Sequence, residues 1–236
     1  MRVRNYCLQL ALVALACVTI FGSSTAQAQI KVTEIWQRGG DDSTPDWFEI
    51  TNVSGASIDP SVFYYDDDSA NPEVDAQLAG ISSLAPGESA VYLTSWHDDF
   101  PGSDFPPPFD PADALAAFNS FWGVDGAYQV GYILDPDTGG GSGLSGGGDA
   151  VYVFDGNTAS ANVVDFAAYT GDNTNGETWH FDPVSGAASL SANGLLGGFL
   201  SVDMSQVGSP GVAVPEPASI LLLMLGCVAV APRRRR

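Results

Sequence analysis

Few side chains of this 236-residue chain have the types and spacing that catalysis or transition-metal binding needs. The two histidines are His97 and His180, and neither has a second histidine or a cysteine at metal-ligand spacing. His97 precedes Asp98 and Asp99 and could ligate a transition metal with them. The alternative for both histidines is an ordinary polar role at the surface.

Ser145 lies in Gly143-Leu-Ser-Gly-Gly147, which fits the G-x-S-x-G pattern of the nucleophile elbow. That motif needs a strand before the serine and a helix after it. Here glycines precede Ser145 and a predicted strand follows, so the sequence favours a glycine-rich loop. Carboxylate pairs for general acid–base catalysis are not excluded, but the abundance of carboxylates makes chance pairs common.

Calcium is the cofactor that two acidic loops could bind, because Ca²⁺ is coordinated by several carboxylate and carbonyl oxygens. Neither loop has the spacing of an EF-hand. The alternative is a pair of solvated turns, in which aspartates accept hydrogen bonds from nearby backbone groups. The candidate ligands are Asp66, Asp67 and Asp68 in one loop and Asp135 and Asp137 in the other.

The five tryptophans and eight tyrosines could stack on sugar rings where they are exposed. We expect most of them in the core, with one exposed carbohydrate platform as the alternative.

The part of the chain between its two apolar ends is strongly acidic and has no thiol. It holds 27 of the 28 acidic residues against two basic residues, Lys31 and Arg38, so its formal charge is −25. Nucleic acid is therefore excluded as the default partner, because Lys and Arg must neutralise its phosphates. All three cysteines (Cys7, Cys17 and Cys227) lie in the ends, which excludes a disulfide framework and a cysteine nucleophile elsewhere.

Residues 1–28 have the pattern of a secretory signal peptide. Arg2 and Arg4 precede an apolar run, and Ala26 and Ala28 provide the small residues that a cleavage site needs. A signal helix that is removed on export is therefore predicted here.

Residues 214–236 combine a short Pro-Glu-Pro sequence, an apolar run over residues 220–231 and four terminal arginines. The apolar run predicts a hydrophobic helix, although it is shorter than the ~20 residues that span a bilayer comfortably. The arginines would keep its end on the cytoplasmic side.

This ending resembles the PEP-CTERM sorting signal of exported bacterial proteins, with Pro215, Glu216 and Pro217 as the naming tripeptide. The resemblance implies that a membrane-embedded exosortase recognises and removes the tail, and releases the protein to the cell surface or the exopolysaccharide matrix. An ordinary C-terminal membrane anchor is the alternative.

Short β-branched segments separated by turn residues predict an all-β sandwich over residues 30–212. In residues 46–53, Phe48 and Ile50 share one face, whereas Trp47, Glu49 and Thr51 share the other. Asp155 and Gly156 begin the loop of a predicted hairpin. The predicted strands are residues 30–36, 46–53, 62–65, 89–94, 128–134, 150–154, 162–169, 178–181 and 199–203.

One short helix is predicted within an insertion. Asp110 and Pro111 are typical of its start and Gly123 of its end. We expect it to lie across an open end or edge of the sandwich. Its apolar stripe is predicted to be Leu115, Phe118 and either Phe121 or Trp122.

The order of these segments over residues 30–212 resembles the lamin-tail domain of bacterial secreted proteins. That resemblance implies an immunoglobulin-like β-sandwich that serves as an accessory or binding module. Residues 98–108 and 41–45 depart from the family pattern. The matching segments are residues 32–35, 46–52, 84–87, 118–123, 143–149, 151–154, 163–166 and 209–211.

These features together predict a secreted or cell-surface protein whose precursor is transiently anchored in the inner membrane. Its β-sandwich would be a non-catalytic structural or adhesive component of the extracellular matrix. The predicted partners are the secretion machinery, an exosortase and exopolysaccharide. A carbohydrate- or calcium-binding recognition module is the alternative, followed by a hydrolase of unrecognised type.

Overall fold

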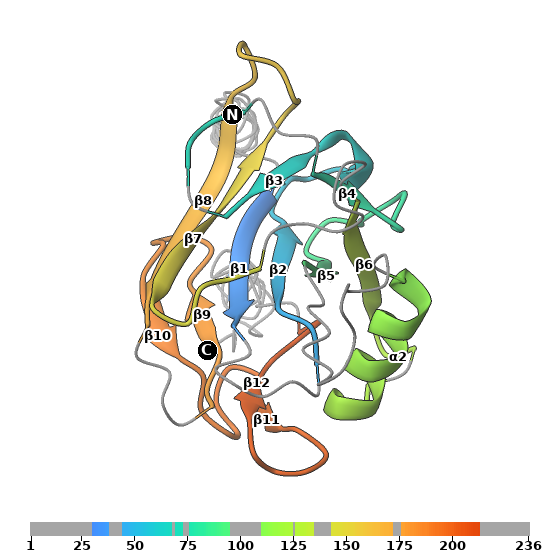
Figure 1. Cartoon of the computed structure of the whole chain (residues 1–236), viewed down its shortest axis with the longest axis vertical. Helices are drawn as coiled ribbons and strands as arrows, with labels where there is room; N and C mark the ends of the chain where they lie inside the picture. The colour runs from blue at the N-terminus through green and yellow to red at the C-terminus, as the bar shows by residue number, and fades with distance from the viewer. Residues whose placement is uncertain are drawn as a thin grey trace, which may run out of the picture.

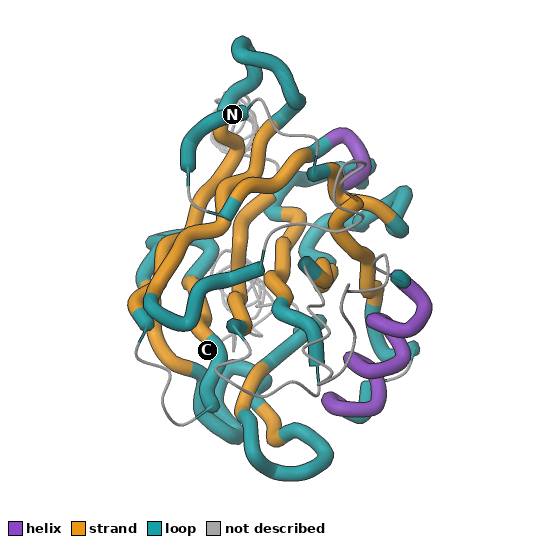
Figure 2. Tube along the Cα trace, in the orientation of Figure 1, coloured by secondary structure: helices purple, strands orange, loops and turns teal. Residues whose placement is uncertain are grey.

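The computed structural model describes residues 30–37, 44–67, 69–72, 76–94, 110–124, 126–134, 143–171 and 176–212, which form an all-β fold with one α-helix, α2 (Pro111–Trp122) (Figure 2). A 3-10 turn, η1, covers Pro60–Val62. The strands are β1 (Ile30–Trp36), β2 (Trp47–Asn52), β3 (Tyr64–Asp66), β4 (Gln77–Ala79), β5 (Ser89–Leu93), β6 (Gln129–Leu134), β7 (Gly148–Phe154), β8 (Val163–Thr170), β9 (Trp179–Phe181), β10 (Ala188–Leu190), β11 (Phe199–Leu200) and β12 (Val207–Gly208).

Ten of these strands form a single mixed sheet in the order β10-β9-β1-β2-β5-β6-β4-β3-β7-β8, and β11 and β12 form a separate ladder (Figure 1). Neighbouring strands are antiparallel except β5 and β6, which are parallel. The all-β prediction is confirmed, and so is the hairpin formed by β7 and β8.

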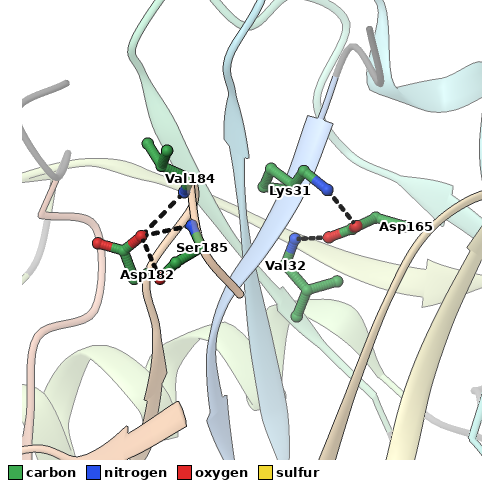
Figure 3. Close-up of polar contacts among 6 residues, drawn as sticks. All are labelled: Lys31, Val32, Asp165, Asp182, Val184 and Ser185. Carbon is green, nitrogen blue, oxygen red and sulfur yellow. Dashed lines mark hydrogen bonds and ion pairs between the residues drawn. The ribbon is translucent and has the colours of Figure 1, made fainter. Parts of the chain in front are cut away.

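The sheet curls so that β8 lies beside β1, although the two strands are not neighbours in its hydrogen-bonded order. Asp165 of β8 joins them with its carboxylate (Figure 3). One oxygen accepts a hydrogen bond from Val32 N at 2.8 Å, and the other forms a 2.7 Å ion pair with Lys31 Nζ. On this edge of β1, β9 pairs only with Glu34 and Ile35. Val32 N lies farther along the same edge, and the carboxylate of Asp165 provides the acceptor that this backbone donor needs.

The main hydrophobic core lies inside this curl. Alternate residues of the strands point inward, as the two-residue period of a strand requires. Phe48 stacks on Tyr65 and Tyr92, with ring centroids 5.1 and 6.0 Å apart, and thereby joins β2 to β3 and β5. The core thus packs residues of β1, β2 and β5 against residues of β3, β7 and β8 from the other half of the curled sheet.

A second core lies on the opposite face of β1, β2 and β5, beneath α2. Trp122 of the helix meets Trp36 and Trp47 edge-on, at centroid distances of 6.1 and 5.8 Å. Phe118 meets Trp47 in the same way at 5.9 Å. Edge-to-face contacts of this kind add about 0.5–1.5 kcal/mol each to the burial of the rings.

The predicted limits of the helix are confirmed. The carboxylate of Asp110 accepts a hydrogen bond from Ala112 N, Pro111 is the first helical residue, and Gly123 ends the helix with a φ of 68°. The predicted position and stripe were wrong in part. The helix packs on the face of the sheet and not across an open end or edge. Leu115 is exposed, while Ala114 is buried with Phe118, Phe121 and Trp122.

The two predicted terminal helices, residues 1–28 and 214–236, lie outside the described residues. Within the described ranges, no helix has both the length and the apolar character required to cross a bilayer.

Candidate functional site

The most unusual chemistry in the described part of the chain is a pair of buried glutamates. Glu34 of β1 and Glu49 of β2 are register partners in the antiparallel ladder, and their side chains are 0% and 2% exposed. They lie on the face opposite the main core. A β-bulge between Val32 and Glu34 shifts the register at this point. Like charges directly opposite each other destabilise a ladder, so this pair requires compensating contacts.

The carboxylate of Glu34 receives hydrogen bonds from three segments that lie far away in the sequence. Its Oε1 accepts from Ser209 N at 2.7 Å and from Thr178 Oγ1, with Ser191 Oγ at 3.4 Å. Its Oε2 accepts from Ser209 Oγ at 3.0 Å. The hydroxyls of Thr178 and Ser191 are themselves 2.6 Å apart.

Glu49 is held by the middle of β1 and by the end of the described chain. Thr33 Oγ1 donates to its Oε1 at 2.6 Å, and Gly211 N donates to its Oε2 at 2.6 Å. From Thr33, a row of hydroxyls continues through Thr51 to Ser89 of β5. The glutamate pair therefore connects the first strand to the C-terminal segment, which we define as residues 207–212.

Burial raises the pKa of Glu34 to about 7, against the opposing effect of its hydrogen bonds to Thr178, Ser209 and Ser191. Burial and the neighbouring Glu34 raise the pKa of Glu49 well above its usual range. Desolvation favours the neutral form of a carboxyl group, and a second carboxylate beside it has the same effect. The two carboxyl groups therefore titrate as a coupled pair, and both favour the neutral form.

Gly211 fits its place because it has no side chain. Its φ is 76°, and a Cβ atom would lie 2.0–2.4 Å from ring atoms of Tyr128. We expect Gly211→Ala to lower the free energy of unfolding by more than about 2 kcal/mol, because it adds both a left-handed backbone penalty and an overpacked contact.

Urea unfolding of Gly211→Ala and of a matched control, Gly186→Ala, measures this effect. Gly186 has a similar φ of 68° but open space where its Cβ atom would lie. The control isolates the backbone penalty, and equal losses for both variants would contradict the predicted clash with Tyr128.

A pocket of about 320 Å³ lies beside the glutamate pair. Ser191 and Ser209, which both donate to Glu34, form part of its wall together with His180. Burial lowers the pKa of His180, which favours the neutral imidazole. Leu190, Leu195 and Leu196 form the apolar part of the wall and remain partly exposed to solvent.

The predicted calcium ligands are only partly described. Asp66 ends β3, where its Oδ2 accepts a hydrogen bond from Ser69 Oγ at 2.5 Å. Asp67 lies close enough to the buried hydroxyl of Tyr65 to raise its pKa, as a further effect added to that of burial. Within the described ranges, no group of three His, Cys, Asp or Glu side chains is placed to hold a metal ion. Asp68, Asp135 and Asp137 lie outside the described residues, and calcium binding stays a prediction.

The other candidate residues of the sequence are spread over the fold. Ser145 lies in the turn before β7, where its hydroxyl accepts a hydrogen bond from Gly147 N at 3.2 Å and a strand follows instead of the helix of a nucleophile elbow. His180 is buried on β9, which corrects its expected surface position. His97 lies outside the described residues, as do the sorting residues Pro215, Glu216 and Pro217 and the cleavage residues Ala26 and Ala28.

The tryptophans are mostly core residues, as predicted. Trp36, Trp47 and Trp122 are buried, Trp179 is half-buried, and Trp96 lies outside the described residues. The exposed aromatic surface is made by other residues instead. Phe166 of β8 is 57% exposed and lies opposite Tyr152 of β7.

Tyr152 and Phe166 belong to a row that crosses three strands. Tyr152 is the register partner of Asp66 on one side and of Phe166 on the other. The rings of Tyr152 and Phe166 are within 12° of parallel, with centroids 5.5 Å apart. Phe154, two residues along β7, is within 13° of parallel to Tyr152 at 6.4 Å.

No family model matches this chain, and no curated protein matches it either. Among solved structures, the chain is similar to the crystal structure of a DUF4876 family protein from Bacteroides thetaiotaomicron. The two sequences are 14% identical, the match covers 80% of this chain and 72% of that chain, and the TM-score is 0.36. A similarity of this size identifies neither a family nor a function.

Proposed function

We propose that this protein is exported and sorted to the cell surface or extracellular matrix, where its β-domain is a non-catalytic structural or adhesive module. The observation that carries the proposal is the three-part ending of residues 214–236: the Pro215-Glu216-Pro217 tripeptide, the apolar run and the arginines. An exosortase would recognise this ending in a precursor held in the inner membrane. Residues 1–28 would direct the chain to the secretion machinery.

The curled sheet supports an immunoglobulin-like, lamin-tail-like sandwich for residues 30–212. Residues of β1, β2 and β5 share one core with residues of β3, β7 and β8. This arrangement of two facing halves is what such a sandwich requires.

The contacts of the glutamate pair support a structural role for its carboxylates. Each of the four carboxylate oxygens accepts at least one hydrogen bond from the chain itself. Their donors tie the C-terminal segment to β1 and β2 immediately before the sorting sequence. A domain closed at this point keeps its fold when the following residues are cut away.

A recognition module for carbohydrate or calcium is the second candidate. The exposed Phe166 and Tyr152 favour carbohydrate, because aromatic rings with an open face stack on sugars.

Replacement of Pro215, Glu216 and Pro217 by alanines tests the sorting role in the native host. We expect the triple variant to accumulate in the inner-membrane fraction, whereas Ser219→Ala, a control two residues beyond the tripeptide, reaches the cell surface like the natural protein. Cell fractionation with an antibody against the β-domain measures the distribution. Equal surface levels of the two variants would overturn exosortase sorting.

A further inference from the structure

From the row Asp66, Tyr152 and Phe166 we infer a binding site for a neutral polysaccharide on the outer face of β3, β7 and β8. This inference rests on the proposed extracellular location and names the partner that the module binds there. The three residues are consecutive register partners, so they occupy one line across three strands.

The exposed end of this aromatic group is Phe166. Tyr152 stacks on Phe166 across the strands and on Phe154 along β7, with interplanar angles of 12° and 13°. Phe154 is buried and supports Tyr152 from one side, whereas Phe166 is 57% exposed. We define Phe166 and the Tyr152 ring stacked on it as the aromatic platform.

This platform has the chemistry that sugar rings require. The C–H face of a pyranose packs on an aromatic ring, and its hydroxyls need hydrogen-bond partners at the edge of the contact. The phenol of Tyr152 and the carboxylate of Asp66 supply such partners in the same row. The centroids of Tyr152 and Phe166 are 5.5 Å apart, about the width of one sugar ring, and Asp66 lies one strand farther along the same row.

The negative charge of the chain favours a neutral polysaccharide over an anionic one. With a formal charge of −25 outside its two ends, the chain repels polyanions such as uronic-acid polymers. An uncharged polymer of hexoses meets no such barrier, and stacking does not depend on charge.

Affinity electrophoresis of the full-length chain tests the inference with three neutral probes: hydroxyethyl cellulose, dextran and laminarin, each over a concentration series. The chain is kept in a polyoxyethylene detergent, because a glucoside or maltoside would compete for the site. We expect retardation by at least one probe, and weaker retardation by the anionic polymer alginate. Lack of retardation by all three neutral probes overturns the inference.

Two variants locate the site. Phe166→Ala is expected to weaken binding roughly tenfold, the factor that corresponds to a stacking contact of about 1.4 kcal/mol. Val202→Ala, which trims an exposed apolar residue between β11 and β12, 65% exposed, is expected to leave binding unchanged. Phe166→Trp should restore the binding lost in Phe166→Ala. An equal loss in Phe166→Ala and Val202→Ala, with thermal unfolding unchanged, contradicts the assignment.

The outcome is separable from that of the proposed function. A chain that reaches the cell surface but binds none of the neutral probes refutes the polysaccharide site and leaves exosortase sorting intact. A chain that binds them with loss in Phe166→Ala, but whose tripeptide variant is sorted normally, refutes the sorting and retains the site.

Discussion

Glu34→Ala is expected to remove at least about 3 kcal/mol from the free energy of unfolding at pH 5. The substitution leaves Ser209 N and Ser209 Oγ without their acceptor in a place where Glu34 itself is 0% exposed. Thr178 Oγ1 also loses Glu34 but keeps the Ser191 hydroxyl at 2.6 Å. A buried donor without a partner costs about 1–3 kcal/mol, and the loss of side-chain volume leaves a cavity in addition.

Glu34→Gln is the matched control for this effect. Its amide oxygen can take the place of Oε1 and accept from Ser209 N, while its amide group donates to the hydroxyl of Ser209, which can turn to accept. We therefore expect Glu34→Gln to keep most of the stability at pH 5. Urea unfolding followed by the fluorescence of the buried tryptophans measures both variants. An Ala variant within about 1 kcal/mol of the Gln variant would contradict the role given to the carboxylate.

The second large effect is a fall in stability between about pH 4.5 and pH 7. The pKa of Glu34 rises from 4.5 in the unfolded chain to about 7 in the folded one. Between these values, the folded state keeps a proton that the unfolded state has lost, so raising the pH favours unfolding. At ~1.4 kcal/mol per unit, the shift corresponds to about 3 kcal/mol. Glu49 acts in the same direction, because its pKa is also raised.

Below this window the trend reverses. Hydrogen bonds lower the pKa values of Asp155 and Asp182, the latter held by the backbone N–H and hydroxyl of Ser185 (Figure 3). Stability from such carboxylates is present above pH 4 and is lost as the pH falls. The melting temperature should therefore peak near pH 4.5 to 5.

A pH series of melting temperatures checks this prediction. The natural chain should melt at a higher temperature at pH 5 than at pH 7.5, and Glu34→Gln should reduce the difference, because it removes the group whose pKa is about 7. A melting temperature that rises from pH 5 to pH 7.5 would show that ionisation of Glu34 and Glu49 does not destabilise the fold. That result would contradict the effect expected from their burial.

The regular elements could largely be predicted from local sequence. The predicted limits of β1 and of α2 agree with the structure residue for residue, because β-branched residues fill β1 and Asp110, Pro111 and Gly123 have the properties that helix ends need. Strands β4, β10 and β12 were not predicted. They are two or three residues long and depend on pairing with distant strands more than on their own composition.

The burial of the glutamate pair could not be predicted from local sequence patterns. The sequence correctly put Glu49 on the face opposite Phe48 and Ile50, and this pattern is typical of a solvent-exposed polar face. That face is buried, because Ser209 and Gly211 cover it from 175 and 162 positions away in the chain. A glutamate on each of two paired strands was the available signal, and it does not reveal which segment covers the pair.

The aromatic row illustrates the same limit. The hairpin of β7 and β8 follows from Asp155 and Gly156 between two β-rich segments. The register of this hairpin decides that Phe166 lies opposite Tyr152. It also depends on a bulge next to Phe154, which could not be predicted from the turn residues. The neighbouring β3 brings Asp66 into the row by a third pairing.

The intact mass of the protein extracted from the surface of its native host tests the central claim most directly. Our account predicts a species that begins near Gln29 and lacks the apolar run and the arginines of residues 220–236. Recovery of the uncut 236-residue chain from the soluble cytosol would contradict it.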